Sequence, residues 1–141
     1  DELVAAGQTP RSGQIINSNA AFLNTFIASY GAVAVDLGIV NDRPRAVFDT
    51  VTASENLDLV VTTGGASVGS HDHIADDLAG DTLDFWKIAM RPGKPLVWGK
   101  IGGTPLLGLP GNPVSTAVCA LIFLAPAISK LFGGTLHHCI F

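Results

Sequence analysis

A glycine-rich loop follows an apolar, β-branched run in the middle of the chain. The run covers Leu57–Thr63, and Gly64-Gly65-Ala66-Ser67-Val68-Gly69 comes directly after it. Glycines let backbone N–H groups approach an anion closely, and the start of a following helix adds a positive dipole end. We therefore interpret Thr62–Asp72 as a cradle for a phosphate or another oxyanion. The alternative is a plain turn from a strand to a helix.

Two aspartates, Asp42 and Asp72, each stand at the expected start of a helix. The simpler interpretation is helix capping, which contributes about 1 kcal/mol at each site. The other interpretation is a pair of carboxylates that hold Mg²⁺ against an anionic ligand, because this hard cation prefers oxygen donors. Spacing alone favours capping.

Three of the chain's 8 Lys and Arg residues lie close together, at Lys87, Arg91 and Lys94. In a strand, the two-residue period puts Lys87 and Arg91 on the same face, and Lys94 follows in the next turn. Such a cluster of cations is suited to holding oxyanions. Lysine also protects edge strands against unwanted pairing, and the pattern supports both interpretations equally.

Asn112-Pro113 opens the last apolar helix. Asparagine caps a helix, proline suits its first turn, and N–H groups from Val114 onward would be free for a second anion site or would serve only the helix. Two rival motifs are weaker. Gly65–Gly69 matches the G-x-S-x-G nucleophile elbow of α/β-hydrolases, but the only histidines well downstream lie in the tail, and the chain is short for that fold. His71 and His73 lack a third neighbouring ligand for zinc.

Alternating strands and helices must position these residues. Strands are expected over residues 32–40, 57–63, 83–90, 96–101 and 105–109, and helices over 17–30, from 41 onward, over 72–78 and over 113–132. This order predicts an α/β fold, a three-layer α/β/α sandwich with a mostly parallel sheet, which a hairpin of the 83–90 and 96–101 strands would make mixed. Ligands bind beyond the carboxyl ends of such strands, so residues 41–42, 62–72 and 110–115 should lie together.

Composition limits the class of protein. The 141 residues suit one domain, which we place at residues 13–134, with an irregular lead-in at 1–12 and a tail at 135–141. With 48% hydrophobic and 14% charged residues, the chain is neither a disordered tail nor a coiled coil. A net charge of −4 gives no footprint for nucleic acid. So few charges predict an oligomer or neighbouring domains.

The expected compartment is the cytoplasm. The chain starts without the basic and apolar pattern of a signal peptide, and its 2 cysteines do not form a disulfide framework. The most apolar stretch, residues 118–128, is about half the roughly 20 residues that span a bilayer. No membrane association is therefore expected.

Three motifs occur in order along the chain. They are Thr63–Asp72 (TGGASVGSHD), Phe85–Pro95 (FWKIAMRPGKP) and Gly108–Ser115 (GLPGNPVS). Together they resemble the molybdopterin-binding domain of the MoeA molybdenum insertases, a family that includes the gephyrin E-domain. The resemblance runs from about Gly7 to Gly134.

The resemblance implies an activity and a set of site residues. MoeA enzymes take adenylated molybdopterin and molybdate, cleave the adenylate with Mg²⁺ present, deliver molybdenum to the dithiolene and release AMP. Asp42 and Asp72 resemble the family's functional acidic residues near the metal and the molybdate, and Lys87 and Arg91 match its oxyanion-binding positions. The implied ligand-binding residues are Thr62, Thr63, Gly64, Gly65, Ser67, Gly69, Lys94, Pro110, Gly111, Asn112 and Ser115.

The sequence departs from the family pattern at two places. Arg91 stands where the family usually has lysine, and Ser70-His71 replaces a pair that typically begins with glutamate. The resemblance also implies a homo-oligomer (dimer or trimer), contact with other molybdenum cofactor enzymes, and further domains that complete the active site. Two alternatives are a MogA/MoaB-like molybdopterin adenylyltransferase and a non-catalytic scaffold domain.

Overall fold

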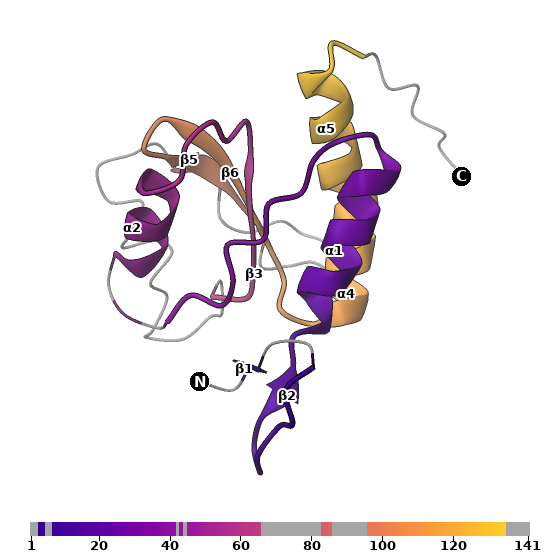
Figure 1. The fold of residues 1–141 in the computed structure, drawn as a ribbon. Coiled ribbons are helices and arrows are strands. Elements are labelled where there is room, and N and C mark those ends of the chain that lie inside the picture. Colours follow the sequence, from indigo (N-terminus) through magenta and orange to yellow (C-terminus); the bar gives the residue numbers. More distant parts are fainter. Residues whose placement is uncertain are drawn as a thin grey trace.

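A sheet lies between two helical layers in the computed structural model (Figure 1). The structure describes residues 3–4, 7–41, 43, 45–65 and 96–134, together with the backbone of 83–85. Helices α1, α4 and α5 cover one face of the sheet, and α2 covers the other. This arrangement is the predicted α/β/α sandwich.

The described sheet has four strands in the order β3-β6-β5-β4. The strands are β3 (Val60–Thr63), β4 (Leu83–Phe85), β5 (Val97–Ile101) and β6 (Thr104–Leu109). β3 runs parallel to β6, whereas β5 is antiparallel to both β6 and β4. The hairpin therefore makes the sheet mixed, as predicted. Among the described strands, β3, β6 and β4 run in one direction and β5 runs in the other.

The expected strand at residues 32–40 is the main difference from the prediction. This segment is irregular, and its valines are exposed, with Val33 at 89% and Val35 at 62%. The Asp36 carboxylate accepts a hydrogen bond of 2.8 Å from the Gly38 N–H, and Gly38 has φ +81°. A local side-chain bond of this kind competes with a strand ladder. The pattern of small and branched apolar residues does not by itself specify a pairing partner.

Helix α1 (Ser18–Ser29) begins and ends where the sequence predicts. The Asn17 side chain accepts a hydrogen bond of 3.2 Å from the Ala20 N–H, and Gly31 follows the helix with φ +79°. Helix α2 (Ala46–Thr52) begins later than expected, because its N-cap position is Arg45 in the left-handed region at φ +62°. Asp42, predicted at the start of this helix, lies outside the described residues. Val51 of α2 is buried.

The last helix is continuous from Pro113 to Leu131. It contains α4 (Pro113–Cys119), a π-helical turn η1 (Ala120–Leu124) and α5 (Ala125–Leu131). The π turn lies directly before Pro126, which has no N–H to donate to the preceding turn. These 19 residues, with a mean hydropathy of 1.9, would suit a membrane span by length and composition alone. A core helix passes the same test, and the inner side of this helix packs on the sheet.

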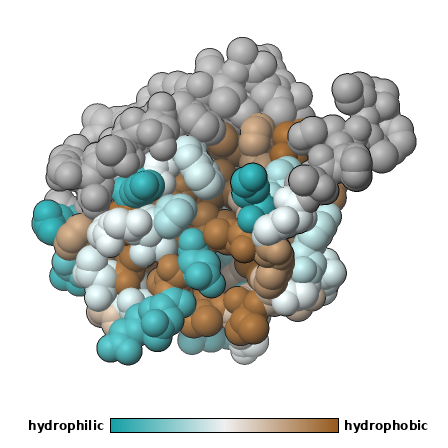
Figure 2. Space-filling view, turned by 90° about the horizontal axis from the view of Figure 1, so that it is seen from above, coloured by the Kyte–Doolittle hydropathy of each residue, from teal (hydrophilic) through white to brown (hydrophobic). Residues whose placement is uncertain are grey.

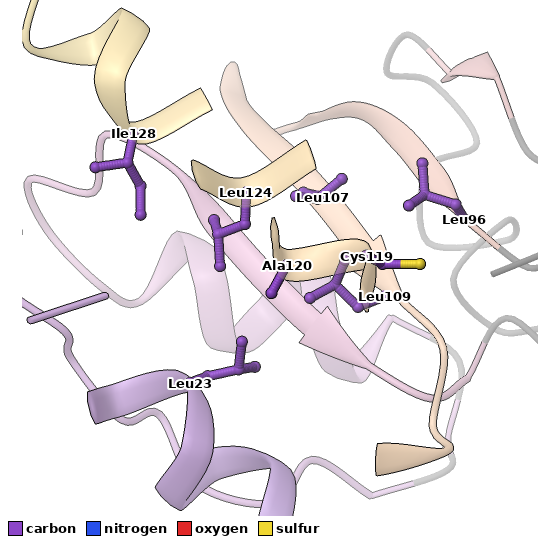
Figure 3. Packing of buried hydrophobic residues seen from close by; sticks show 8 residues of the cluster. All are labelled: Leu23, Leu96, Leu107, Leu109, Cys119, Ala120, Leu124 and Ile128. Atoms are coloured by element: carbon purple, nitrogen blue, oxygen red, sulfur yellow. The ribbon is translucent and has the colours of Figure 1, made fainter. Parts of the chain in front are cut away.

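The larger core joins this helix to α1 and the sheet. Figure 3 shows Leu23 of α1 pointing toward Ala120 and Leu124, with Leu107 and Leu109 beside them. Cys119 is fully buried in the same cluster, where its free thiol acts as a small apolar group. A second cluster on the opposite face packs Val51 of α2 against Val60, Val97, Ile101 and Leu106.

The predicted irregular lead-in contains a short strand. β1 (Leu3–Val4) pairs in parallel with β2 (Ile15–Ile16), and the Asn17 N–H donates to the Val4 carbonyl at 2.9 Å. This small pair lies at the N-terminal end of α1, apart from the main sheet (Figure 1). The structure therefore ties residues 3–4 to the start of α1.

Candidate functional site

The carboxyl ends of β3 and β6 bring two of the predicted loops together. The strands pair in parallel from Val60↔Leu106 to Thr63↔Leu109, so Gly64 and Pro110 follow from the same edge of the sheet. The Gly64 N–H donates to the Leu109 carbonyl at 3.0 Å and extends the pairing by one step. Residues 62–65 and 110–115 are therefore neighbours, as the sequence predicts for the ends of parallel strands.

Glycines at this edge let the two backbones meet. A Cβ built on Gly111 would lie 3.4 Å from the Gly64 Cα. Gly64 and Gly65 have φ of +80° and +72°, a region that residues with a side chain rarely adopt. Gly111 is therefore needed so that the two backbone segments can approach each other. Gly64 and Gly65 are needed for the backbone conformation of the loop after β3.

The 110–112 loop is held by side chains on two helices. Thr116 of α4 lies with its Oγ1 2.6 Å from the Pro110 carbonyl and 2.9 Å from the Asn112 carbonyl. From α1, the Asn19 amide donates to the Gly111 carbonyl at 2.8 Å. All three carbonyls of the loop are thus fixed from within the protein.

Asn112 acts as the cap of α4. Its Oδ1 accepts hydrogen bonds from the N–H groups of Val114 and Ser115, at 3.0 and 3.2 Å. The expectation that N–H groups from Val114 onward are free is therefore wrong, because the capping side chain already uses the first two. This geometry supports the structural interpretation of Asn112-Pro113 that the sequence left open.

Other donors at this edge have no partner among the described residues. They are the backbone N–H groups of Gly65, Gly111 and Asn112. The Oγ1 of Thr62 is also buried without a hydrogen-bond partner, the one such side-chain atom in the described part of the chain. A buried hydroxyl without a partner is costly, and a bound molecule or water would satisfy it. Backbone donors and a hydroxyl together are suited to an anion.

An open cleft of about 1080 Å³ leads to this edge. The 31–41 segment forms one wall, and the free edge of β3 forms the other, with Leu124 and Ile128 of the last helix at one side. Thr62, Thr63, Gly64, Gly65 and Gly111 line its polar end. The view in Figure 2 shows apolar side chains across the middle of one face, with hydrophilic side chains beside them. The cleft therefore combines apolar walls with a polar, glycine-lined end.

Several predicted site residues lie outside the described residues. They are Asp42, Ser67, Gly69, Asp72, Lys87, Arg91 and Lys94. Their roles remain predictions from the sequence. Within the described ranges, no group of three or more His, Cys, Asp or Glu residues lies together to hold a metal ion. The described part of the site is thus a backbone and hydroxyl site.

Two residues that the sequence did not single out for the site are Asn19 and Thr116. They are the two buried polar side chains among the described residues, at 8% and 0% exposure, and both bind the 110–112 loop. Asn19 was predicted only as part of a capping cluster. A polar residue on the inner side of an apolar helix would have been the signal for both.

Comparison with known proteins agrees with this fold. The chain matches the family model described as "Probable molybdopterin binding domain" over residues 1–130. A molybdopterin molybdenumtransferase of Nostoc is 40% identical over 139 residues, which cover 94% of this chain and 32% of that protein. The chain therefore spans about a third of the length of this relative.

Solved structures show the same fold. The molybdopterin biosynthesis MoeA protein of Pyrococcus horikoshii superposes with a TM-score of 0.81 at 29% identity, over 94% of this chain and 33% of the other. The molybdopterin biosynthesis enzyme MoaB of Thermus thermophilus superposes with a TM-score of 0.61 at 22% identity, over 96% of both chains. The second likeness shows the fold alone, and both agree with the predicted α/β class.

Proposed function

Because the chain belongs to the family of probable molybdopterin binding domains, we propose that it binds adenylated molybdopterin in the cleft beside β3. The phosphates would lie at the glycine-lined end, and the pterin would extend between the apolar walls. The chain would serve molybdenum cofactor biosynthesis as the ligand-holding domain of a larger molybdenum insertase. The relative's name supports the insertase, and the chain's share of about a third of that relative supports a domain role.

The observation that carries this proposal is the meeting of the two glycine loops. Gly64 and Gly111 touch at the end of the cleft, and the N–H groups of Gly65, Gly111 and the adjoining Asn112 have no partner among the described residues. A diphosphate bridge needs several donors close together and no bulky side chains. The buried hydroxyl of Thr62 and the Thr63 and Ser115 side chains would add further donors.

Charged residues from the sequence would complete the site. Lys87, Arg91 and Lys94 are proposed to bind molybdate and phosphate oxygens, and Ser67 and Gly69 to continue the cradle. Asp42 and Asp72 are proposed to hold Mg²⁺, which, when bound, would neutralise phosphate charge as the adenylate is cleaved. The work of the chain's own residues is to hold the substrate still and to place cations where negative charge gathers.

The experiment is calorimetric titration of the chain with adenylated molybdopterin, with and without Mg²⁺ and molybdate, followed by assay of the mixture for AMP. Binding without AMP release is expected, because the 141 residues correspond to only about a third of the length of the Nostoc relative. Binding with AMP release would show that this domain alone is an active molybdenumtransferase. Absence of binding would contradict the proposal and favour a scaffold role.

Variants sharpen the test. Lys87→Ala should weaken binding at low salt by about tenfold, because a cation that contacts a phosphate oxygen is lost. Lys130→Ala is the matched control, since Lys130 is exposed near the end of α5 and should leave binding unchanged. If Lys87→Ala lowers the melting temperature but not the affinity, Lys87 protects a strand edge. Consumption of ATP with molybdopterin would instead identify the adenylyltransferase alternative.

A further inference from the structure

Asn19 has a buried polar side chain that α1 does not need as a cap. It is the second residue of α1 and is 8% exposed. The helix is already capped by Asn17, whose side chain accepts from the Ala20 N–H. The Asn19 amide instead donates to the Gly111 carbonyl at 2.8 Å, across 92 positions in the sequence. Burial of an amide is costly unless it makes such a bond, so the bond gives this residue its reason to be polar.

The bond fixes one peptide plane of the candidate site. The Gly111 carbonyl and the Asn112 N–H belong to the same planar, trans peptide unit, so they point in opposite directions. With the carbonyl turned toward Asn19, the Asn112 N–H is directed away from α1, and it has no partner among the described residues. The same peptide carries Gly111 against Gly64, where a Cβ would lie only 3.4 Å away.

A second observation indicates that buried side chains hold the 110–112 loop in place. Only Asn19 and Thr116 are buried polar side chains within the described ranges, and both contact carbonyls of residues 110–112. They come from different helices, α1 and α4. Two independent buried contacts on one three-residue loop rigidify it before any ligand arrives, and a rigid loop loses less entropy on binding.

We propose that Asn19 is a positioning residue of the ligand site. Its amide orients the Gly111–Asn112 peptide so that the Asn112 N–H is directed toward the bound phosphates and Gly111 stays against Gly64. This inference rests on the proposed binding of adenylated molybdopterin. It assigns to Asn19 of α1 a part in ligand recognition that acts through the Gly111–Asn112 peptide.

The test compares three variants by calorimetric titration with adenylated molybdopterin, well below their melting temperatures. Asn19→Ala removes the amide donor, and Asn19→Asp keeps the shape but places a carboxylate beside the Gly111 carbonyl. Asn17→Ala is the matched control, because it removes a hydrogen bond from the same turn of α1 without touching the loop. We expect Kd to rise about tenfold in Asn19→Ala and further in Asn19→Asp. In Asn17→Ala, Kd should stay within about twofold of the starting protein while the melting temperature falls by a few degrees.

Two results would overturn the proposal. One is a lowered melting temperature in Asn19→Ala with Kd unchanged, which would make Asn19 a purely structural residue. The other is an equal loss of affinity in Asn17→Ala, which would assign the effect to helix stability rather than to the Gly111 bond. If Asn19→Ala does not fold, the isosteric Asn19→Asp decides between the same outcomes. Failure of the starting protein to bind would contradict the proposed function instead, so the two failures are distinguishable.

Discussion

Gly108 occupies a place in β6 where a side chain has no room. It pairs with Thr62 on one side and with Val97 on the other. A Cβ at this position would lie 2.9 Å from the Val97 Cβ and 3.3 Å from the Thr62 Oγ1. The glycine therefore sets the spacing of three strands directly below the candidate site.

We expect Gly108→Ala to destabilise the fold by about 1–3 kcal/mol, because the added methyl group overpacks the centre of the sheet. The measurement is urea unfolding, in which the midpoint should fall while the slope stays constant. Thr25→Ala is the control, since Thr25 is exposed on α1 and bonds only within its own helix. An unchanged midpoint in Gly108→Ala would contradict the packing described for β6.

Cys119 is a buried thiol whose ionisation the fold opposes. It is fully buried in the larger core, and desolvation raises its pKa above the ordinary value. The unfolded chain ionises this thiol at lower pH than the native protein does. Above the unfolded pKa, the unfolded state therefore binds fewer protons, and the free energy of unfolding falls as pH rises.

The raised pKa of Cys119 predicts how the stability of the protein changes with pH. In a Cys139→Ser background, the stability of the protein should decrease as pH is raised from about 8 to 10. A further Cys119→Ala change should remove that part of the decrease. Alkylation of Cys119 by iodoacetamide should also be slow until the protein is unfolded. Rapid alkylation of the native protein would show that the thiol is accessible in solution.

At the level of elements, the irregular 31–41 segment does not pair with β3, whose outer edge has no partner strand among the described residues. Its hydrogen bond from Gly38 to Asp36 is local, and the cleft separates the segment from the strand. The backbone of β6, by contrast, pairs on both sides. The 31–41 segment and β6 are both apolar in sequence. The free energy of local opening should nevertheless be much lower for the 31–41 segment than for β6.

Hydrogen exchange measures this difference. Amides of residues 106–109 should be protected to an extent close to the global free energy of unfolding, whereas amides of residues 33–37 should show protection near zero. Helix α1 provides an internal reference, because its amides bond within a helix of ordinary length. Equal protection of residues 33–37 and β6 would mean that the segment pairs with β3 in solution, as its sequence suggested.

The sequence predicted those elements whose boundaries carry local signals. Asn17 and Gly31 delimit α1, Gly102-Gly103 turns β5 into β6, and Asn112-Pro113 opens the last helix. These residues act within a few positions of themselves, so their effect can be inferred without the fold. The meeting of Gly64 with Gly111 was also predictable, because parallel strands end at a common edge.

Other features depend on contacts that no local pattern contains. Residues 32–40 are irregular and contain a local hydrogen bond at Asp36, and α2 starts late, after the left-handed Arg45. The bond from Asn19 to Gly111 joins positions 92 residues apart. Tertiary placement decides such features, and the residue types alone were compatible with several outcomes.

At the scale of the whole molecule, the described residues expose several large apolar side chains. On the last helix and just after it, these are Val114, Leu121, Ile122, Leu131 and Phe132. Only 14% of the chain is charged. Exposed apolar surface is typical of contacts with another subunit or domain.

We therefore expect the chain to associate in solution. Light scattering after size exclusion should give a mass above the 14.6 kDa of one chain. Leu121→Glu should lower that mass, because it places a charge in the shared apolar surface. Thr25→Glu is the control, since it adds the same charge at an exposed polar position of α1. A monomer at all concentrations would mean that other domains, rather than copies of the chain, cover this surface.

The contact between Gly64 and Gly111 also has a consequence for the evolution of the sequence. Where two main chains touch, recognition depends on peptide groups that every residue carries, and side-chain chemistry has little to contribute. At position 111, substitutions should be tolerated according to volume and hardly according to polarity or charge. Relatives could therefore exchange much of the surrounding surface while the same few peptide groups continue to bind the same kind of anion.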